Sequence, residues 1–585
     1  MKQLFTNIRL AAGTAREHLT DDPALLILQI SRLLPPRLVH PLARLVRRST
    51  GMDSVALPAL LAGLIAGDQQ DVARRLENAL SRSSLSAEHA RSMADVALVA
   101  NRPDLADAFL VRATGARRFR AVQARRFWYG GAMTAAVRIL EDAQGGAERM
   151  QGRRLAADLR ILEGWRPELA TVRFEPVPHR VLHVLTNSLP HTASGYAQRS
   201  HSILLAQQEA GWEVLAVTRL AYPVQVGKIL AKARDFVDGV QYRRLLPSSL
   251  APTMDARLQQ QAEELLKVAL EFQPSVLHTT THFVNGLVVR AVAEALGIPW
   301  VYEVRGQLAD TWAATRGPQA RTSEKYRLFQ DREADLMRDA DLVVTLGRAM
   351  KANIIAAGIP SEKIIIAPNA VGGAFLKQPL DAISARRKLG LPDDGLFIGT
   401  VSSLVGYEGL DDLVSAFALL APRYPQLRLL IVGDGVAGPG LREQVRGLGL
   451  DDRAIFTGRV PRDLTPLYHQ ALDVFVVPRK DLDVTRAVTP LKPVEALASG
   501  RPVVGSDLPA LREIIDDGGN GLLTPAASPS QLAETISELL SDKSRRAFMG
   551  HTGRAAVLAE RTWAANAKAL ATRYAGLHHE IEEND

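Results

Sequence analysis

The pattern of apolar and polar positions divides this chain into two regions of different periodicity. Residues 1–175 are rich in Ala, Leu and Arg and show little alternation of β-branched residues, which predicts helices throughout. Beyond a proline-punctuated linker near residues 165–179, short apolar runs alternate with amphipathic segments. Such alternation is typical of a parallel sheet covered by helices. The predicted strands of this sheet are Val181–Leu185, Val214–Thr218, Val276–His278, Trp300–Glu303 and Leu342–Thr345.

A weak internal repeat runs through the helical region. Asp71–Leu76, Asp104–Phe109 and Thr134–Ile139 recur at offsets of 33 and 30 residues, each after a short turn. This period predicts stacked helical hairpins similar to tetratricopeptide repeats, although the usual aromatic and proline marks are mostly missing. We interpret residues 1–175 as a degenerate repeat domain for docking. A helical extension with no partner is the alternative.

Polar side chains follow three strands of the first predicted sheet. Because ligands bind at the carboxyl ends of parallel strands, three polar strand ends together predict a ligand-binding cleft. A Ser-Gly pair before a helix also lets the backbone approach a ligand closely. The residues at these strand ends are Ser194, Gly195 and Tyr196, then His282 and Asn285, then Glu303 and Arg305.

A second candidate site lies in the stretch from Arg486 to Ile515, which predicts a loop, a helix from about Pro493, a short strand and a second helix. Free backbone N–H groups at a helix start, together with Lys492 and Arg486, suit a phosphate group. Glu495 would lie in the first helical turn, close enough to accept sugar hydroxyls. An ordinary βα unit with a capped helix is the alternative interpretation of this stretch taken alone.

Composition and charge narrow the class of protein. With 585 residues the chain is long enough for about three domains, and the absence of cysteine excludes disulfides and thiolate metal sites. The formal net charge of +8 arises in residues 1–175, which hold 26 basic and 18 acidic residues. The densest basic clusters are Arg44, Arg47 and Arg48, then Arg117, Arg118, Arg120, Arg125 and Arg126. Such clusters suit an anionic membrane face or a protein partner, a solvated helical face being the alternative, and no nucleic-acid module accompanies them.

The start of the chain shows no pattern of an export signal. The longest apolar run of the helical region, Val55–Ala66, is interrupted by Pro58 and Gly63 and is too short to cross a bilayer. We therefore expect a cytoplasmic protein, peripheral at the inner face of the cell membrane.

Several motifs resemble one enzyme family. The sequence PVEALASGRPVVGSDLPALREII, which starts at Pro493, resembles the donor-site signature of the retaining family 4 glycosyltransferases with the GT-B fold. The motifs SLPHTASGY, YEVRG, LLIVGDG, IFTGRV and VTPLKP resemble other parts of the same family, in a branch with SGY in place of a Gly-Gly loop. In the family's Glu-x7-Glu pair the second glutamate corresponds to Glu495, whereas the first falls on Ala487. The resemblance covers about residues 180–560.

The resemblance implies two facing Rossmann-like domains behind the helical region. The expected organisation is a helical domain at 1–175, an acceptor domain at 176–375 and a nucleotide-sugar donor domain at 376–560. A C-terminal helix at 561–585 would cross back to the acceptor domain. Pro368-Asn369 leads into residues 371–391, which we expect to be the hinge linker.

The resemblance also implies roles for individual residues. Most family members bind the nucleotide diphosphate with an arginine and a lysine, but this chain has Ser403 and Glu408 at those positions. Replacement cations must come from Arg479, Arg486 and Lys492. The other expected donor-site residues are Glu495, Thr489, Leu491, Ser403, Gly433, Gly435, Arg459 and Val460. The expected acceptor residues are Ser194, Gly195, Tyr196, His282, Asn285 and Arg305, and the expected catalytic residues are Arg305, Glu303 and Lys492.

The implied reaction is transfer of a sugar, with retention of configuration, from a nucleotide-diphosphate sugar to a cell-envelope glycan or lipid-linked acceptor. No metal and no cofactor beyond the co-substrate is implied, and we interpret Asp481-Leu-Asp483 as structural. Two alternatives remain open: a nucleotide-sugar epimerase or hydrolase with the same fold, and a non-catalytic scaffold with a decayed site.

Overall fold

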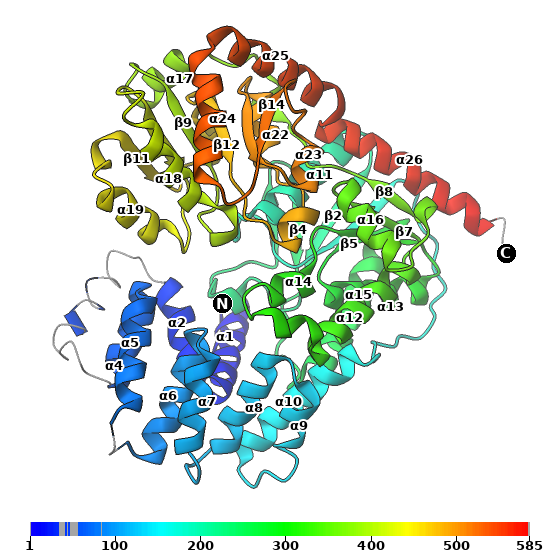
Figure 1. Cartoon of the computed structure of the whole chain (residues 1–585). Coiled ribbons are helices and arrows are strands. Elements are labelled where there is room, and N and C mark those ends of the chain that lie inside the picture. Colours follow the sequence, from blue (N-terminus) through cyan, green and yellow to red (C-terminus); the bar gives the residue numbers. More distant parts are fainter. Residues whose placement is uncertain are drawn as a thin grey trace.

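The computed structural model of the chain describes residues 2–33, 41, 43, 45, 46, 56–82 and 85–582, and shows three parts. A helical part comes first, followed by two α/β domains, each built on one sheet (Figure 1). This arrangement confirms the predicted fold class. The first basic cluster predicted from the sequence, Arg44, Arg47 and Arg48, lies outside the described residues.

The helical part is built from antiparallel helix pairs that share one core. Leu60, Leu76, Met93, Phe109 and Val122 come from five successive helices and are all fully buried in that core. The three segments of the sequence repeat fall on α5, α7 and α9, the second helix of three successive pairs. The described helices are α1 (Lys2–Asp21), α2 (Pro23–Leu33), α4 (Leu57–Ala66), α5 (Gln69–Leu80), α6 (Ala87–Val99), α7 (Pro103–Arg112), α8 (Phe119–Gly130), α9 (Met133–Arg138) and α10 (Gly146–Leu162).

The first α/β domain has a sheet in the order β3-β4-β2-β1-β5-β6-β7-β8, parallel except for β3. The strands are β1 (Arg180–Leu185), β2 (Glu213–Thr218), β3 (Arg234–Val237), β4 (Val240–Arg244), β5 (Val276–Thr280), β6 (Trp300–Val304), β7 (Leu342–Thr345) and β8 (Ile364–Ile366). Its helices are α11 (Gly195–Glu209), α12 (Met254–Phe272), α13 (Phe283–Leu296), α14 (Leu308–Ala313), α15 (Glu324–Asp339) and α16 (Arg348–Ala356). β1, β5 and β6, whose ends carry the predicted polar residues, are neighbours at the centre of the sheet.

The second α/β domain has a wholly parallel sheet in the order β11-β10-β9-β12-β13-β14. The strands are β9 (Phe397–Val401), β10 (Arg428–Val432), β11 (Ala454–Gly458), β12 (Val474–Val477), β13 (Val503–Ser506) and β14 (Gly521–Thr524). The helices are α17 (Ala382–Leu389), α18 (Leu410–Leu420), α19 (Gly438–Gly447), α20 (Thr465–Gln470), α21 (Asp483–Ala487), α22 (Lys492–Ala498), α23 (Pro509–Arg512), α24 (Pro529–Ser541) and α25 (Lys543–Glu560).

The predicted hinge linker at 371–391 is wrong over its second half. Residues Ala382–Leu389 form α17, with Asp381 capping the helix through a bond from the Ser384 N–H. Ala385 and Arg386 of this helix are buried, and the Arg386 side chain bonds the Ala471 carbonyl at 2.8 Å. The segment therefore belongs to the packed second domain, because its alanine and arginine stem complete that domain's core.

The last helix, α26 (Trp563–Glu582), leaves the second domain and packs on the first. Leu570 and Tyr574 of α26 are fully buried in one core with Val181 of β1 and Trp212. Figure 1 shows this helix as the red segment that runs from the second domain along the edge of the first. The two α/β domains are thus joined by the chain crossover near Asn369 and again by α26.

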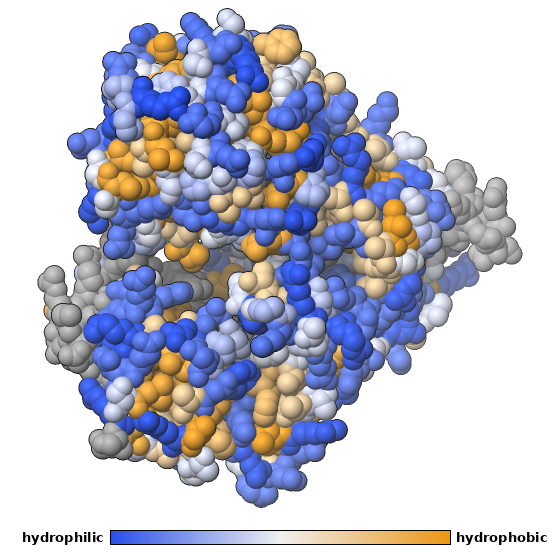
Figure 2. Space-filling view, in the orientation of Figure 1, coloured by the Kyte–Doolittle hydropathy of each residue, from blue (hydrophilic) through white to orange (hydrophobic). Residues whose placement is uncertain are grey.

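The helical part is fixed to the first α/β domain at both of its ends. Asn7 of α1 donates to the Ile229 carbonyl at 2.9 Å, and Arg160 of α10 pairs with Asp255 of α12. Between these ends, the Thr134 N–H of α9 bonds the carboxylate of Glu324 on α15 at 2.9 Å. Between this helical part and the second domain the surface is hollowed (Figure 2). Among the described helices, none is both long and apolar enough to cross a bilayer.

Candidate active site

The end of β1 leads into a helix start that places a tyrosine at the surface. The Ser194 hydroxyl accepts a bond from the Ala197 N–H at 3.3 Å and so caps α11. Tyr196, in the first turn, is 53% exposed. A Cβ added at Gly306, just after β6, would lie 3.1 Å from the Tyr196 hydroxyl oxygen, so this glycine leaves room for the phenol. The ends of β1 and β6 are thus brought together, as the sequence predicts.

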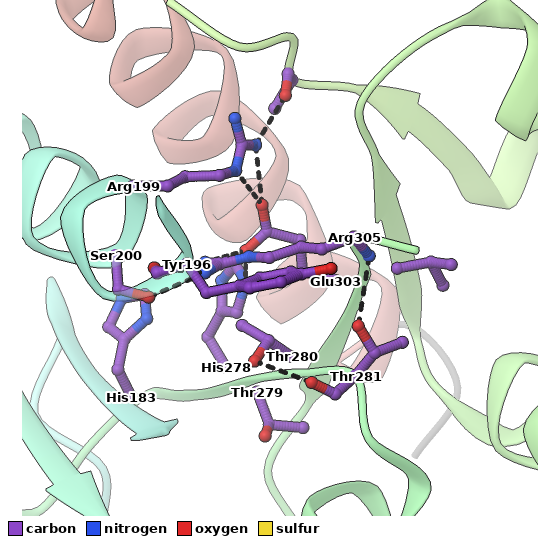
Figure 3. A network of polar contacts seen from close by, with 12 residues as sticks. His183, Tyr196, Arg199, Ser200, His278, Thr279, Thr280, Thr281, Glu303 and Arg305 are labelled. Atoms are coloured by element: carbon purple, nitrogen blue, oxygen red, sulfur yellow. Dashed lines mark hydrogen bonds and ion pairs between the residues drawn. The ribbon is translucent and has the colours of Figure 1, made fainter. Parts of the chain in front are cut away.

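Directly below Tyr196 lies a buried network of two arginines and a glutamate (Figure 3). Arg199 of α11 donates to one oxygen of Glu303 through Nε at 2.9 Å and through Nη2 at 2.7 Å. Arg305 donates to the other oxygen at 2.5 Å and to the Ser200 hydroxyl at 2.7 Å. Both oxygens of the Glu303 carboxylate are therefore occupied by guanidinium groups.

Glu303 is buried and is held in its ionised form by two arginines. Burial alone would raise the pKa of this carboxyl, but Arg305 and Arg199 outweigh burial and hold the pKa well below its ordinary value. Glu303 is fully buried, so its predicted direct catalytic role does not fit this geometry. It holds the Arg305 guanidinium in place beneath Tyr196 instead. Arg305 itself is only 3% exposed, and its Nε has no hydrogen-bond partner among the described residues.

A pair of histidines supports this network from behind. His183 of β1 and His278 of β5 stack with ring centroids 4.6 Å apart, and His278 Nε2 lies 3.5 Å from the Glu303 carboxylate. The other ring nitrogen of His278 is 2.5 Å from the hydroxyl of Tyr574 on α26. Burial lowers the pKa of both imidazoles, which favours the neutral form. The C-terminal helix thereby reaches the back of the site.

The remaining predicted acceptor residues hold the loops rather than line the surface. His282 caps α13 by accepting the Val284 N–H, and its ring packs on Phe283 and Phe329. Burial, followed by nearby positive charge, lowers the pKa of His282 to about 4. Asn285 is buried and donates to the Thr186 hydroxyl at 2.8 Å.

The second domain contributes a cluster of two cations around one carboxylate. Glu408 accepts from Lys492 Nζ at 2.7 Å and from Arg479 Nη2 at 3.1 Å. Lys492 also donates to the Ser402 hydroxyl at 2.7 Å. Burial raises the pKa of Glu408, but the two cations outweigh it and bring the pKa down to about 2. The cluster of Arg479, Lys492 and Glu408, which we call the cation cluster, therefore carries one net positive charge.

Two glycine turns bring the backbone close to this cluster. Gly433 has φ +133°, and a Cβ there would lie 1.8 Å from the Ser402 carbonyl oxygen. A Cβ at Gly435 would lie 2.3 Å from the Leu404 carbonyl oxygen. Only glycine lets the turn after β10 pass over the turn after β9. Both turns then lie at the carboxyl edge of the second sheet.

The other predicted donor residues are spread more widely. Glu495 lies in the first turn of α22, as the sequence predicts, with one carboxylate oxygen 3.5 Å from His469. Arg486 does not join the cation cluster, because it is exposed on α21 and pairs with Asp481 at 2.5 Å. Arg459 and Ser403 are exposed, Val460 and Leu491 are half-buried, and Thr489 is buried.

The two sites meet where the domains touch. The Val488 carbonyl accepts from Arg479 of the cation cluster at 2.9 Å, and its side chain lies 4.0 Å from a Cβ position at Gly306. The neighbouring Thr489 carbonyl accepts from Asn369 of the crossover at 2.8 Å. The cation cluster of the second domain thus faces the Tyr196 and Arg305 region of the first.

Sequence reasoning missed Arg199, His183, His278 and Tyr574. Arg199 follows Gly195 by one helical turn, so its position on the α11 face toward the sheet was the available signal. Among the residues that the structure describes, no group of three or more His, Asp or Glu is placed to hold a metal ion.

Two facing α/β domains with an ion cluster at their junction define a protein of the two-domain GT-B class. The model for "Glycosyl transferases group 1" matches residues 381–556, and the model for "Glycosyl transferase 4-like domain" matches residues 194–370. The chain therefore belongs to the family 4 glycosyltransferases. Both matches lie outside the helical part.

Curated relatives and solved structures agree with this assignment. The chain is 27% identical over 48% of its length to an alpha-monoglucosyldiacylglycerol synthase of Streptococcus pneumoniae. It is 30% identical over 41% of its length to a GDP-mannose-dependent phosphatidylinositol monomannoside mannosyltransferase of Mycolicibacterium smegmatis. The matches span 66% and 63% of these relatives' own lengths, less than two thirds of each.

Two solved structures share the fold. Sucrose-phosphate synthase from Thermosynechococcus elongatus aligns with a TM-score of 0.57 at 21% identity, over 68% of this chain and 100% of that one. The Anabaena protein HepE in complex with UDP aligns with a TM-score of 0.54 at 19% identity, again over 68% and 100%.

Proposed function

We propose that this protein is a retaining glycosyltransferase that moves a sugar from a nucleoside diphosphate sugar to a lipid-linked or glycan acceptor of the cell envelope. One observation carries the proposal: the cation cluster of the second domain faces the Tyr196 and Arg305 region of the first across the domain junction. The names of the relatives, which act on diacylglycerol and phosphatidylinositol glycolipids, support a lipid-linked acceptor.

The chemistry follows from charge. As the bond between the sugar and the diphosphate breaks, negative charge builds up on the leaving diphosphate. Lys492 and Arg479 would stabilise that charge as fixed cations. They would take the role of the arginine and the lysine that most family members carry where this chain has Ser403 and Glu408. Glu408 would then share its two cations with the phosphate oxygens. No step assigned to these residues uses a metal ion.

The first domain would place the acceptor. Tyr196 is exposed at the start of α11, and the buried Arg305 lies beneath it and adds positive charge there. Closure of the two domains would exclude water from the reacting atoms, which protects the donor from hydrolysis. We also propose that the protein works at the cytoplasmic side, peripheral to the membrane.

The test compares two variants with a matched control. Lys492→Ala and Glu495→Ala each lower the affinity for a nucleoside diphosphate or the turnover of a nucleotide-sugar panel. Lys480→Ala removes an equal charge from the same domain, where Lys480 pairs with Asp411 and Asp412, and leaves both unchanged. Full activity in either of the first two variants contradicts the proposal.

Ligand-dependent thermal stabilisation separates the alternatives, because a ligand that binds only the folded state raises the melting temperature. No shift with any nucleoside diphosphate favours the scaffold, an alternative supported by the partial neutralisation of Arg479 and Lys492 by Glu408. A shift accompanied by slow donor hydrolysis without acceptor favours the transferase. Conversion of the donor to its epimer favours the epimerase.

A further inference from the structure

The first helix and a loop of the acceptor domain together expose five large apolar side chains. Phe5 is 71% exposed and Leu230 is 78% exposed, so both protrude from the surface. Leu4, Ile8 and Ile229 are each between 40% and 47% exposed. Single exposed apolar residues are ordinary, but a cluster from two distant segments marks an interaction surface. We call these five residues the α1 surface.

A buried asparagine holds the two segments side by side. Asn7, which is 1% exposed, donates from Nδ2 to the Ile229 carbonyl at 2.9 Å and to the Ala231 carbonyl at 2.8 Å. Leu10 of α1 shares a small core with Ala221 and Ala231 of the loop. The carbonyls on both sides of Leu230 are therefore fixed inward, and its side chain is the one that projects.

Basic residues lie on both segments of the α1 surface. Residues 3–16 and 219–234 together hold six basic residues, and the acidic residues that directly follow these segments, Glu17 and Asp235, pair with Arg257 and Arg244. Arg9, Lys228 and Lys232 are exposed beside the apolar side chains. By contrast, the arginine cluster of α8 is partly neutralised, since Arg125 pairs with Asp95 and Arg126 with Asp107. On the α1 surface, protruding apolar side chains therefore lie next to exposed basic side chains.

The α1 surface lies at the acceptor edge of the first sheet. Its loop follows the carboxyl end of β2, and the Tyr222 hydroxyl in that loop donates to the Ser188 carbonyl at 2.8 Å. Ser188 belongs to the neighbouring loop after β1, which leads to Ser194 and Tyr196. Figure 1 shows α1 starting on the side of the helical part that faces the second domain. A ligand layer held here would lie next to the proposed acceptor site.

We propose that the α1 surface docks the protein on an anionic lipid bilayer, with Phe5 and Leu230 inserting among the lipid headgroups and the exposed Lys and Arg residues contacting lipid phosphates. This inference rests on the proposed function, because it supplies the membrane face from which a lipid-linked acceptor reaches Tyr196. Protruding apolar tips ringed by basic residues match the chemistry of an anionic interface, where aromatic and leucine side chains insert and lysines contact phosphate.

Vesicle flotation of the full-length protein tests the proposal. Wild-type protein floats with vesicles of phosphatidylcholine and phosphatidylglycerol, binds phosphatidylcholine vesicles less, and loses binding as salt rises. The double variant Phe5→Ser/Leu230→Ser reduces the partition coefficient by about tenfold or more, because two inserted side chains are lost. The matched control is Phe548→Ser/Val111→Ser, which changes residues that are 63% and 78% exposed on α25 and α7. This control floats like the wild type.

The inference is overturned by a wild-type protein that stays in the soluble fraction, by undiminished binding in the double variant, or by an equal loss in the control. Binding to dispersed lipid monomers but not to vesicles also overturns it. Calorimetric binding of UDP in solution separates this inference from the proposed function. We expect the double variant to bind UDP as the wild type does, whereas a wild type that binds no nucleotide contradicts the proposed function whatever the vesicles show.

Discussion

The carboxylate in the cation cluster offers the sharpest test of whether the cluster is a donor site. Replacing Glu408 with Gln keeps the shape of the side chain and removes its charge. Glu408 is 5% exposed and has a pKa of about 2, against an ordinary value of 4.5. That difference corresponds to about 3 kcal/mol of stability at neutral pH, so Glu408→Gln should lower the free energy of unfolding by about that amount.

The pH dependence of this loss has a defined sign. Because the pKa of Glu408 is lower in the folded than in the unfolded state, its contribution is fully present above the unfolded value of 4.5. The contribution disappears as pH falls toward about 2. Urea unfolding at pH 7 and at pH 3.5 should therefore show a smaller difference between wild type and variant at the lower pH.

The same substitution should strengthen nucleotide binding. A phosphate held by Lys492 and Arg479 would lie about 6 Å from the Glu408 carboxylate, where like charges repel by roughly 1–3 kcal/mol after screening. Removing the charge should tighten UDP binding by about tenfold in a calorimetric titration. Glu534→Gln is the control, because Glu534 is 71% exposed in an ion pair with Arg423 and should change neither quantity measurably.

A variant that loses stability but binds UDP no more tightly would refute this reasoning. In that case the two cations exist to balance Glu408, and the cluster is a structural ion network of the second domain. A gain in affinity together with a loss of stability is the result that only a ligand-binding cluster gives.

Three further perturbations test the surrounding structure. Glu303→Gln leaves the guanidinium groups of Arg199 and Arg305 without a buried counterion and should lower the free energy of unfolding in urea by about 3–5 kcal/mol. A loss below about 1 kcal/mol would contradict this. Burial raises the pKa of Glu333 from 4.5 to about 7, so the stability of the folded state should fall as pH rises from 4.5 through 7. In thermal melts, Glu333→Gln should flatten that fall. Identical pH profiles for the two proteins would be inconsistent with this. Glu513→Ala removes the carboxylate that accepts the Arg348 N–H across the domain junction at 2.6 Å. The radius of gyration in X-ray scattering should therefore increase. An unchanged radius would show that other contacts hold the domains together.

Much of the fold was predictable because its central strands are continuous apolar runs. Val181–Leu185 and Leu342–Thr345 lie within β1 and β7, where both faces are covered by helices. The hairpin of β3 and β4 was missed because Arg234–Val237 and Val240–Arg244 are short and contain charged and polar residues in place of a continuous apolar run. Helix α17 was missed because its apolar content is low, and its burial depends on partners more than 80 residues away.

The candidate site could be predicted only in part, for a similar reason. Lys492 and Arg305 stand inside recognisable motifs, so the sequence nominates them. The bond between Arg199 and Glu303 joins residues 104 positions apart, and the bond between Arg479 and Glu408 joins residues 71 positions apart. Pairings of this kind follow from tertiary structure and leave no local pattern. For that reason, only the folded structure shows that Glu303, a candidate catalytic group by its motif, supports Arg305.

The reach of α26 into the first domain has a consequence for synthesis of the protein. During translation the first α/β domain emerges from the ribosome long before Leu570 and Tyr574, which fill its core against Val181 and Trp212. Until those residues are made, the nascent domain exposes an apolar groove and leaves His278 without its phenol partner. The support behind the Arg199–Glu303–Arg305 network is therefore completed late in synthesis, and a chain truncated before α26 lacks the phenol that bonds His278.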